Sequence, residues 1–215
     1  DPDQIRAVCD FVGTMLAGFD TAPKRAIFIA SLCDLLEMTD PREVSRDALA
    51  AIFPRLRELV ANAGNATQGR PGWFTRMAFR TLLGLYMRRD EDVLTGRAGR
   101  LSRTLALIKV ILGLGGFRAL GLSHREGKLR RAKLFRAGFH SGNPDDFALF
   151  WRLIRNRLDS NQFMGHANNG RSFISGLRSL ALLYPLVVAV AKYSAANRAA
   201  TKIEADDVDY AVMSI

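Results

Sequence analysis

Residues 165–172 have the spacing of a phosphate-binding loop. They run Gly-His-Ala-Asn-Asn-Gly-Arg-Ser, which is the P-loop pattern except that Arg171 replaces the lysine. That lysine is a compact charge on the β and γ phosphates, which a planar guanidinium does not reproduce, and a P-loop follows a strand, whereas a helical pattern precedes this one. We therefore interpret the stretch as a capped helix start that could also bind a simple anion, with four candidate residues at the helix N-terminus: Asn169, Gly170, Arg171 and Ser172.

The other short motifs do not assemble a catalytic or metal site. Residues 113–117 lack the third glycine of a dinucleotide fingerprint, because Arg118 stands in its place, and no βαβ pattern surrounds them. No two of the three histidines are spaced to share one helical face. The acidic runs 90–92 and 206–207 fall at helix ends, where carboxylates are usually structural. We predict no metal, no cofactor and no catalytic residue, so a binding protein is favoured over an enzyme.

Cys9 and Cys33 are the only cysteines, and each lies in an apolar helical pattern. Two thiols alone cannot form a four-ligand zinc or iron–sulfur site. We expect both to be buried as small hydrophobic side chains, unpaired, in a reducing compartment. The N-terminal residues show no export signal, which predicts a cytoplasmic protein. The chain also lacks an initiating methionine, so we expect it to be a piece of a longer protein.

The strongest functional candidate is the segment 123–140, where cations alternate with apolar residues at about a helical interval. The basic side chains of such a segment could contact the phosphates of a nucleic acid while Phe135 and Phe139 pack inward. The same pattern suits an anionic membrane surface, and the alternative is a solvated basic face. The predicted anion-binding residues are Arg125, Lys128, Arg130, Arg131, Lys133 and Arg136.

The basic charge is concentrated in the middle of the chain. Residues 51–140 carry 18 Lys or Arg against five Asp or Glu, a net charge of +13, whereas residues 1–50 carry −4 and residues 141–215 carry +1. A concentrated basic region favours an anionic partner. Because 25 of the 31 basic residues are Arg, the alternative is the codon usage of a GC-rich genome, a bacterial-type composition.

Hydrophobic periodicity predicts helices along the chain, and no stretch alternates with period two for long enough to require a sheet. Pro54 should kink or break the third helix. The segment 105–122 is either a buried or an interfacial helix. In the fourth helix we expect the inward residues to be Phe74, Met77, Leu82, Leu85 and Tyr86. The predicted helices span residues 3–19, 27–38, 44–60, 73–89, 105–122, 143–158, 171–198 and 205 onward.

The chain is organised around residues 179–191, which contain no charge. This run is shorter than the roughly 20 apolar residues that cross a bilayer, and it contains Pro185, so we expect no transmembrane span. A helix that is apolar on every side must be surrounded by others. The sequence therefore predicts an all-α fold, a multi-helix orthogonal bundle around a long central apolar helix at residues 171–198. An N-terminal helical subdomain (residues 1–61) should precede a main helical domain (residues 73–215).

Two stretches near the C-terminus carry a family resemblance. They are FWRLIRNRLDSNQFM at residues 150–164 and GLRSLALLYPLVVAVAKYSAANRAATKIEADDVDYAVMSI at residues 176–215. Residues 147–215 thus resemble the C-terminal helical part of the flagellin lysine N-methylase family and related cysteine-cluster proteins. The cysteine cluster of that family is absent, so neither metal binding nor methyl transfer is carried over to any residue. The resemblance implies a helical accessory part of a methylase-like enzyme.

Together these patterns predict a non-catalytic helical interaction module. Its basic central region should bind an anionic or acidic partner, with an acidic protein or a larger complex favoured. Nucleic-acid binding is the first alternative, and it requires the arginines of residues 125–136 to share one exposed face with those of residues 76–103. Peripheral membrane contact and the methylase-like accessory role are the others.

Overall fold

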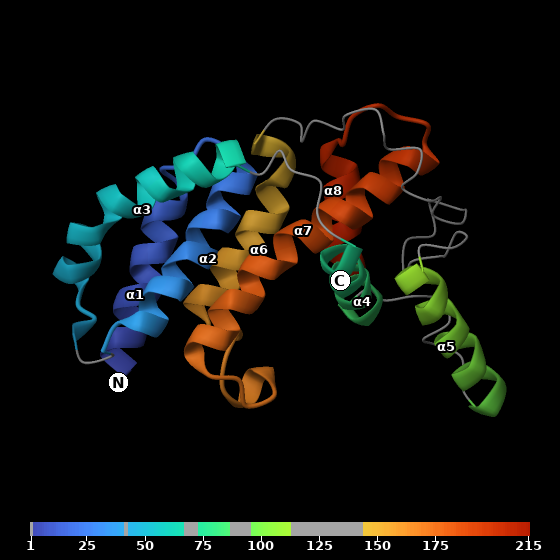
Figure 1. Cartoon of the computed structure of the whole chain (residues 1–215), viewed down its shortest axis with the longest axis horizontal. Helices are drawn as coiled ribbons and strands as arrows, with labels where there is room; N and C mark the ends of the chain where they lie inside the picture. Colours follow the sequence, from blue (N-terminus) through green and yellow to red (C-terminus); the bar gives the residue numbers. More distant parts are fainter. Residues whose placement is uncertain (1, 41–42, 67–72, 87–95, 113–143) are drawn as a thin grey trace. The chain divides into compact units, whose positions relative to one another are not determined.

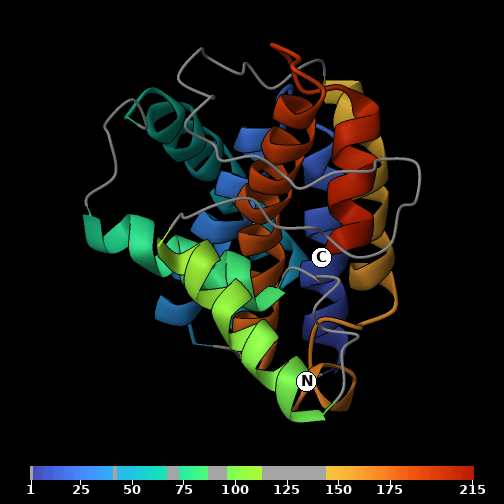
Figure 2. The same ribbon diagram turned by 90° about the vertical axis from the view of Figure 1, so that its right-hand side faces the viewer.

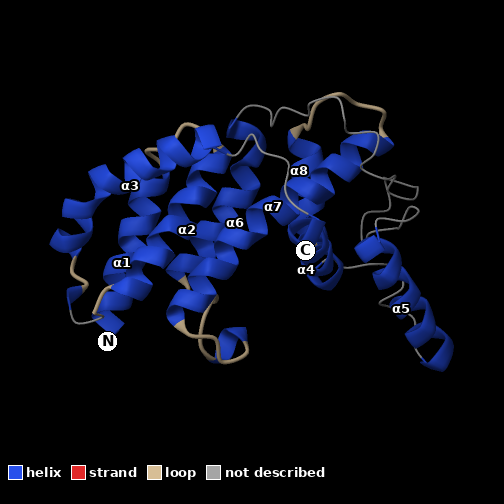
Figure 3. Cartoon of the chain, in the orientation of Figure 1, coloured by secondary structure: helices blue, strands red, loops and turns tan. Residues whose placement is uncertain are grey.

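The computed structural model describes residues 2–40, 43–66, 73–86, 96–112 and 144–215. Over these ranges the chain forms eight α-helices with short 3-10 turns, η4 (Pro144–Phe147) and η5 (His166–Asn168), and no β-strand (Figures 1 and 3). The predicted all-α multi-helix bundle is confirmed. The helices are α1 (Pro2–Leu16), α2 (Ala22–Met38), α3 (Arg46–Ala66), α4 (Trp73–Tyr86), α5 (Gly96–Leu112), α6 (Ala148–Asp159), α7 (Phe173–Asn197) and α8 (Ala205–Ser214).

The chain divides into two compact units, each built from two separate stretches. The first unit comprises Asp1–Gly69 and Phe150–Tyr184, and the second comprises Arg70–Leu149 and Pro185–Ile215. Helices α1 to α3, most of α6 and the first half of α7 therefore belong to the first unit. The second unit contains α4, α5, η4, the second half of α7 and α8. The division predicted at residues 61–73 stays a prediction.

The first unit has a core of phenylalanine rings. Phe28 of α2 is fully buried, and its ring centroid lies 6.1 Å from that of Phe11 and 5.0 Å from that of Phe19. Phe53 of α3 meets all three rings edge-on at 6.0 to 6.2 Å. Edge-to-face contacts at these distances are favourable because the positive ring edge meets the negative ring face. The rings thus join α1, α2 and α3.

Helix α3 runs through Pro54 without a break. Proline removes one amide donor, which leaves the carbonyl of Ala50 without its helical partner. Both Pro54 and Ala50 are exposed, so water can hydrogen-bond that carbonyl. On either side of Pro54, Leu56 is buried and Phe53 lies in the ring cluster, and these contacts anchor the helix there. Of the two outcomes predicted for Pro54, the break is therefore wrong, and the kink stays a prediction.

Helix α7 is the long apolar helix that the sequence predicts. It includes the uncharged run 179–191 and passes through Pro185. Its burial is incomplete, because Leu182 is 45% exposed. Among the described residues, α7 alone is long and apolar enough to cross a membrane, with a mean hydropathy of 1.8 over a window that is 44% buried inside the structure. The core helix of a soluble protein meets the same criterion of length and composition.

In the second unit, ion pairs close the turn between α7 and α8. The guanidinium of Arg198 pairs with Glu204 at 2.9 Å and with the fully buried carboxylate of Asp207. That carboxylate also accepts a hydrogen bond from the backbone N–H of Glu204 at 3.2 Å, so Asp207 in the first turn of α8 helps to cap that helix. Helix α8 begins at Ala205 with Asp206 and Asp207 in its first turn, as predicted.

Candidate interaction surface

Helices α4 and α5 pack closely against each other within the second unit (Figure 2). Gly84 of α4 is the point of approach, because a Cβ atom there would lie 2.6 Å from Cδ1 of Leu107 and 3.5 Å from Cγ1 of Val110. Ala106 and Val110 of α5 are buried. Helix α5 therefore meets Gly84 of α4 with Leu107 and Val110, which leaves its other large aliphatic side chains elsewhere.

Those larger side chains form one exposed row, which we call the α5 stripe. It consists of four residues at i, i+4, i+7 and i+11, a spacing that places them on one face of a helix. Their exposed fractions are 63, 48, 43 and 51% for Leu101, Leu105, Ile108 and Leu112. Contiguous exposed apolar patches commonly mark contact surfaces, which makes the α5 stripe a candidate interaction surface.

Helix α4 adds three exposed apolar residues. Trp73 is 65% exposed, Phe74 is 82% exposed, and their rings meet edge-on with centroids 4.9 Å apart. Leu85, at the other end of the helix, is 64% exposed. The prediction that Phe74 and Leu85 face inward is therefore wrong. The buried side of α4 is formed by Leu83 and Gly84 instead, because the close approach of α5 at Gly84 decides which face is covered.

Only positive charges lie on these two helices. Arg76, Arg100 and Lys109 are exposed, and Arg80 and Arg103 are half-buried. Neither α4 nor α5 contains Asp or Glu, while the acidic run 90–92 lies between them in the chain and outside the described residues. We define the α4–α5 surface as Trp73, Phe74, Arg76, Leu85, Arg100, Lys109 and the α5 stripe. It combines apolar and cationic groups with no described carboxylate.

The predicted anion-binding residues of the basic segment lie outside the described residues: Arg125, Lys128, Arg130, Arg131, Lys133 and Arg136. The segment 105–122 is described only as far as Leu112. In that part Leu105, Ile108 and Leu112 are exposed, as expected for an interfacial helix. Ala106 and Val110 are buried, as expected for a buried helix.

The predicted anion site at the start of α7 lies in a loop that is closed by its own hydrogen bonds. Gly165 and Gly170 adopt positive φ angles of 61° and 73°, and the N–H of Gly170 donates to the carbonyl of Gly165 at 2.8 Å. The N–H of Arg171 donates to Asn168 at 3.1 Å. These amides are used inside the loop, which supports the interpretation as a capped helix start.

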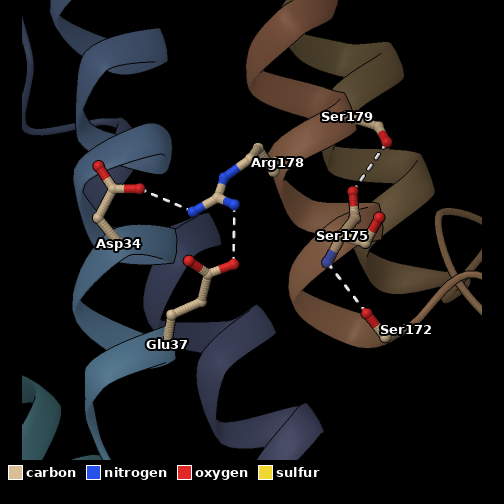
Figure 4. Close-up of polar contacts among 6 residues, drawn as sticks. All are labelled: Asp34, Glu37, Ser172, Ser175, Arg178 and Ser179. Carbon is tan, nitrogen blue, oxygen red and sulfur yellow. Dashed lines mark hydrogen bonds and ion pairs between the residues drawn. The ribbon is translucent and has the colours of Figure 1, made fainter.

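Side chains at the start of α7 also form hydrogen bonds with the helix backbone and with one another. The Ser172 hydroxyl accepts the N–H of Ser175 at 3.4 Å, and the Ser179 hydroxyl donates to the carbonyl of Ser175 at 2.8 Å (Figure 4). The guanidinium of Arg171 donates to the Ser179 hydroxyl. Of the four candidate residues, Asn169 is the left-handed residue that ends η5, with a φ of 52°. Anion binding by this group stays a prediction.

Sequence reasoning missed an ion pair that joins α7 to α2. Arg178 lies between two carboxylates, with Nη2 2.7 Å from Asp34 and Nη1 2.8 Å from Glu37 (Figure 4). The hydrogen bond to Glu37 is the main cause that raises the pKa of Arg178 above its ordinary value. The only signal in the sequence was the i, i+3 spacing of Asp34 and Glu37, which places both on one helical face.

A cavity of about 270 Å³ lies within the first unit, slightly smaller than the roughly 300–1,000 Å³ typical of ligand pockets. Its wall carries no charged side chain, and Gln4 and Ser172 are its only polar residues. The candidate anion-site residue Ser172 thus borders an apolar space, which does not suit a charged ligand. The lining residues are Gln4, Ile5, Val8, Leu36, Val44, Ser172, Phe173 and Ile174.

Both cysteines are buried and free, as expected. Burial raises the pKa of the Cys9 thiol to about 11 and that of the Cys33 thiol to about 12, so both are protonated near neutral pH. Within the described ranges, no group of three or more His, Cys, Asp or Glu side chains could hold a metal ion.

Comparison with known proteins finds no family model that matches this chain. No curated protein and no solved structure matches it either. The resemblance of residues 147–215 to the flagellin lysine N-methylase family therefore stays a prediction.

Proposed function

We propose that this protein is a non-catalytic helical interaction module that binds an anionic partner through its basic central region. The α4–α5 surface is the contact that the described residues offer. The observation that carries the proposal is the α5 stripe, four large aliphatic side chains that are each about half exposed beside Arg100 and Lys109. Contact surfaces commonly combine an apolar centre with a polar rim in this way.

The charges on the surface define the kind of partner. Because the two helices carry cations and no carboxylate, they attract acidic proteins, nucleic acid and anionic lipid, and repel basic partners. An acidic protein or larger complex satisfies both the charges and the apolar stripe. Nucleic acid satisfies only the charges, and it gains support only if Arg130 and Arg131 of the basic segment join Arg76 and Arg100 on one face.

A binding assay across a salt series tests the proposal. The purified chain is titrated with poly-glutamate, a mixed-sequence DNA duplex and anionic vesicles, beside the variant Arg100→Glu/Lys109→Glu. We expect binding to at least one polyanion that weakens as salt rises and is lost in the variant, because reversed charges repel the partner. The matched control is Arg152→Glu/Arg155→Glu on α6, which makes the same charge change at exposed positions of the first unit and should bind normally.

Two results would refute the proposal. One is the absence of binding to all three polyanions at low salt. The other is equal loss in the α6 control, which would show that only the net charge of +10 matters and that no particular surface is involved.

A further inference from the structure

We propose that the partner of the α4–α5 surface is an anionic phospholipid membrane, on which the protein docks peripherally. The α5 stripe enters the boundary between headgroups and acyl chains, while Arg100 and Lys109 contact the phosphates. This inference rests on the proposed function and names its partner class.

The geometry of the α5 stripe matches a helix that lies in the membrane interface. From Leu101 to Leu112 the row extends about 16 Å along one helix, at 1.5 Å per residue. Amphipathic helices bind membranes with such a face, buried roughly 5–10 Å deep, when Lys or Arg side chains border it. Here Lys109 lies between Ile108 and Leu112 in the sequence, and Arg100 precedes Leu101. Both cations are exposed and can extend their heads to the phosphates while their methylene stems cover apolar surface.

The aromatic pair of α4 supports the same partner. Trp73 and Phe74 are among the most exposed large apolar residues of the described chain. Tryptophan is enriched at membrane–water interfaces because one side of the indole is apolar and its N–H is polar. Helix α4 also carries Arg76, one turn after Trp73 and exposed, so both helices repeat the same combination of apolar and cationic side chains.

Charge and shape together favour a bilayer over the other polyanions. Nucleic acid supplies phosphates but no apolar phase for a row of leucine and isoleucine side chains. An acidic protein would need a groove that fits the stripe. An anionic bilayer supplies negative charge and an apolar interior at one surface and needs no shape match.

Co-sedimentation with vesicles tests the inference on the full chain. Vesicles of phosphatidylcholine and phosphatidylglycerol in equal parts are compared with vesicles of phosphatidylcholine alone. We expect clear binding only to the anionic vesicles. The variant Leu105→Ser/Ile108→Ser should bind about 30-fold more weakly, since it removes two aliphatic side chains that would leave water. Arg100→Glu/Lys109→Glu should bind about 100-fold more weakly or worse, because each cation near an anionic surface is replaced by an anion. All four positions are exposed, so folding should be retained.

The fluorescence emission of Trp73 should change only if the protein enters the membrane interface, because adsorption by charge alone would leave it unchanged. The chain has two tryptophans, and the other, Trp151, is half-buried between Arg25 and Tyr184 in the first unit. In a Trp151→Phe background, anionic vesicles should shift the Trp73 emission to the blue, and bromine-labelled acyl chains should quench it. The same vesicles should leave the emission of Trp151 unchanged in a Trp73→Phe background.

The outcomes separate this inference from the function on which it rests. Binding to poly-glutamate or DNA without binding to vesicles would overturn the membrane inference and leave the interaction module standing. Vesicle binding that Leu105→Ser/Ile108→Ser does not weaken, with no change at Trp73, would also overturn it, because the protein would then adsorb by charge alone. Failure to bind any polyanion would refute both.

Discussion

Replacing Gly176 with alanine should destabilise the protein, although alanine favours helices more than glycine does. Gly176 lies in the first turn of α7, and a Cβ atom there would be 2.1 Å from the carbonyl oxygen of Phe163 and 2.9 Å from its carbonyl carbon. These are backbone atoms, which cannot rotate away as a side chain would. The Phe163 ring is buried and packs 5.6 Å from that of Phe173, so moving the carbonyl disturbs this packing as well.

The expected size of the effect follows from two opposing terms. Forcing extra atoms into a packed site costs about 1–3 kcal/mol, and displacing a buried aromatic side chain raises that to about 2–4 kcal/mol. The higher helix propensity of alanine offsets about 1 kcal/mol. We therefore expect Gly176→Ala to lower the free energy of unfolding by about 1–3 kcal/mol, which corresponds to a fall in Tm of roughly 2–12 °C for a chain of this size.

Gly13→Ala in α1 is the matched control. It makes the same substitution inside a helix of the same unit, but a Cβ atom at Gly13 meets nothing within 4 Å. This variant should raise the free energy of unfolding by about 0.5–1 kcal/mol. Urea unfolding followed by circular dichroism measures both. If Gly176→Ala proves as stable as Gly13→Ala, the close approach of α7 to Phe163 does not constrain the fold and our reasoning is wrong.

Three further predictions concern polar groups. Arg178→Met should lower the urea midpoint at low salt and less so at high salt, because its partners Asp34 and Glu37 are exposed and screened; equal loss at both salt concentrations would contradict this. Asp207→Asn should cost about 2 kcal/mol in unfolding free energy, since it weakens a helix cap and an ion pair whose carboxylate is fully buried, whereas Asp206→Asn at the neighbouring exposed position should cost much less. Burial raises the pKa of Cys9 to about 11 and that of Cys33 to about 12, so the thiols ionise at lower pH in the unfolded chain, and the free energy of unfolding should fall as the pH rises from about 9 towards these values. In urea unfolding at a series of pH values, Cys9→Ala/Cys33→Ala should flatten that fall. An unchanged slope would exclude the thiols as its cause.

Periodicity in the sequence was enough to identify the helices but not the surface that they leave open. Helix α7 could be predicted because its run between Arg178 and Lys192 is apolar on every side of a helix. The segment 105–122 was open to two interpretations, buried or interfacial, since residues at helical spacing share a face whether or not another element covers it.

The errors of prediction arise from contacts between segments that are distant in sequence. Phe74 and Leu85 were expected inside because they are apolar, but the approach of α5 to Gly84 buries another face of α4. Pro54 was expected to kink or break α3, but the helix continues through it, with Phe53 in the ring cluster and Leu56 buried. No local rule relates Gly176 to Phe163 or Arg178 to Asp34, because these contacts exist only once the chain has folded.

The composition of each unit from two stretches affects how the protein folds as it leaves the ribosome. The first unit contains α1, α2 and α3 together with Phe150–Tyr184, and residues 70–149 are synthesised in between. Until the later stretch emerges, Cys9 lacks its contact with Asn161, Asp34 lacks Arg178, and Arg25 lacks the ring of Trp151. The N-terminal helices therefore stay incompletely packed until residues 70–149 and the later stretch have been translated. During that time part of their apolar surface is exposed to water and to chaperones.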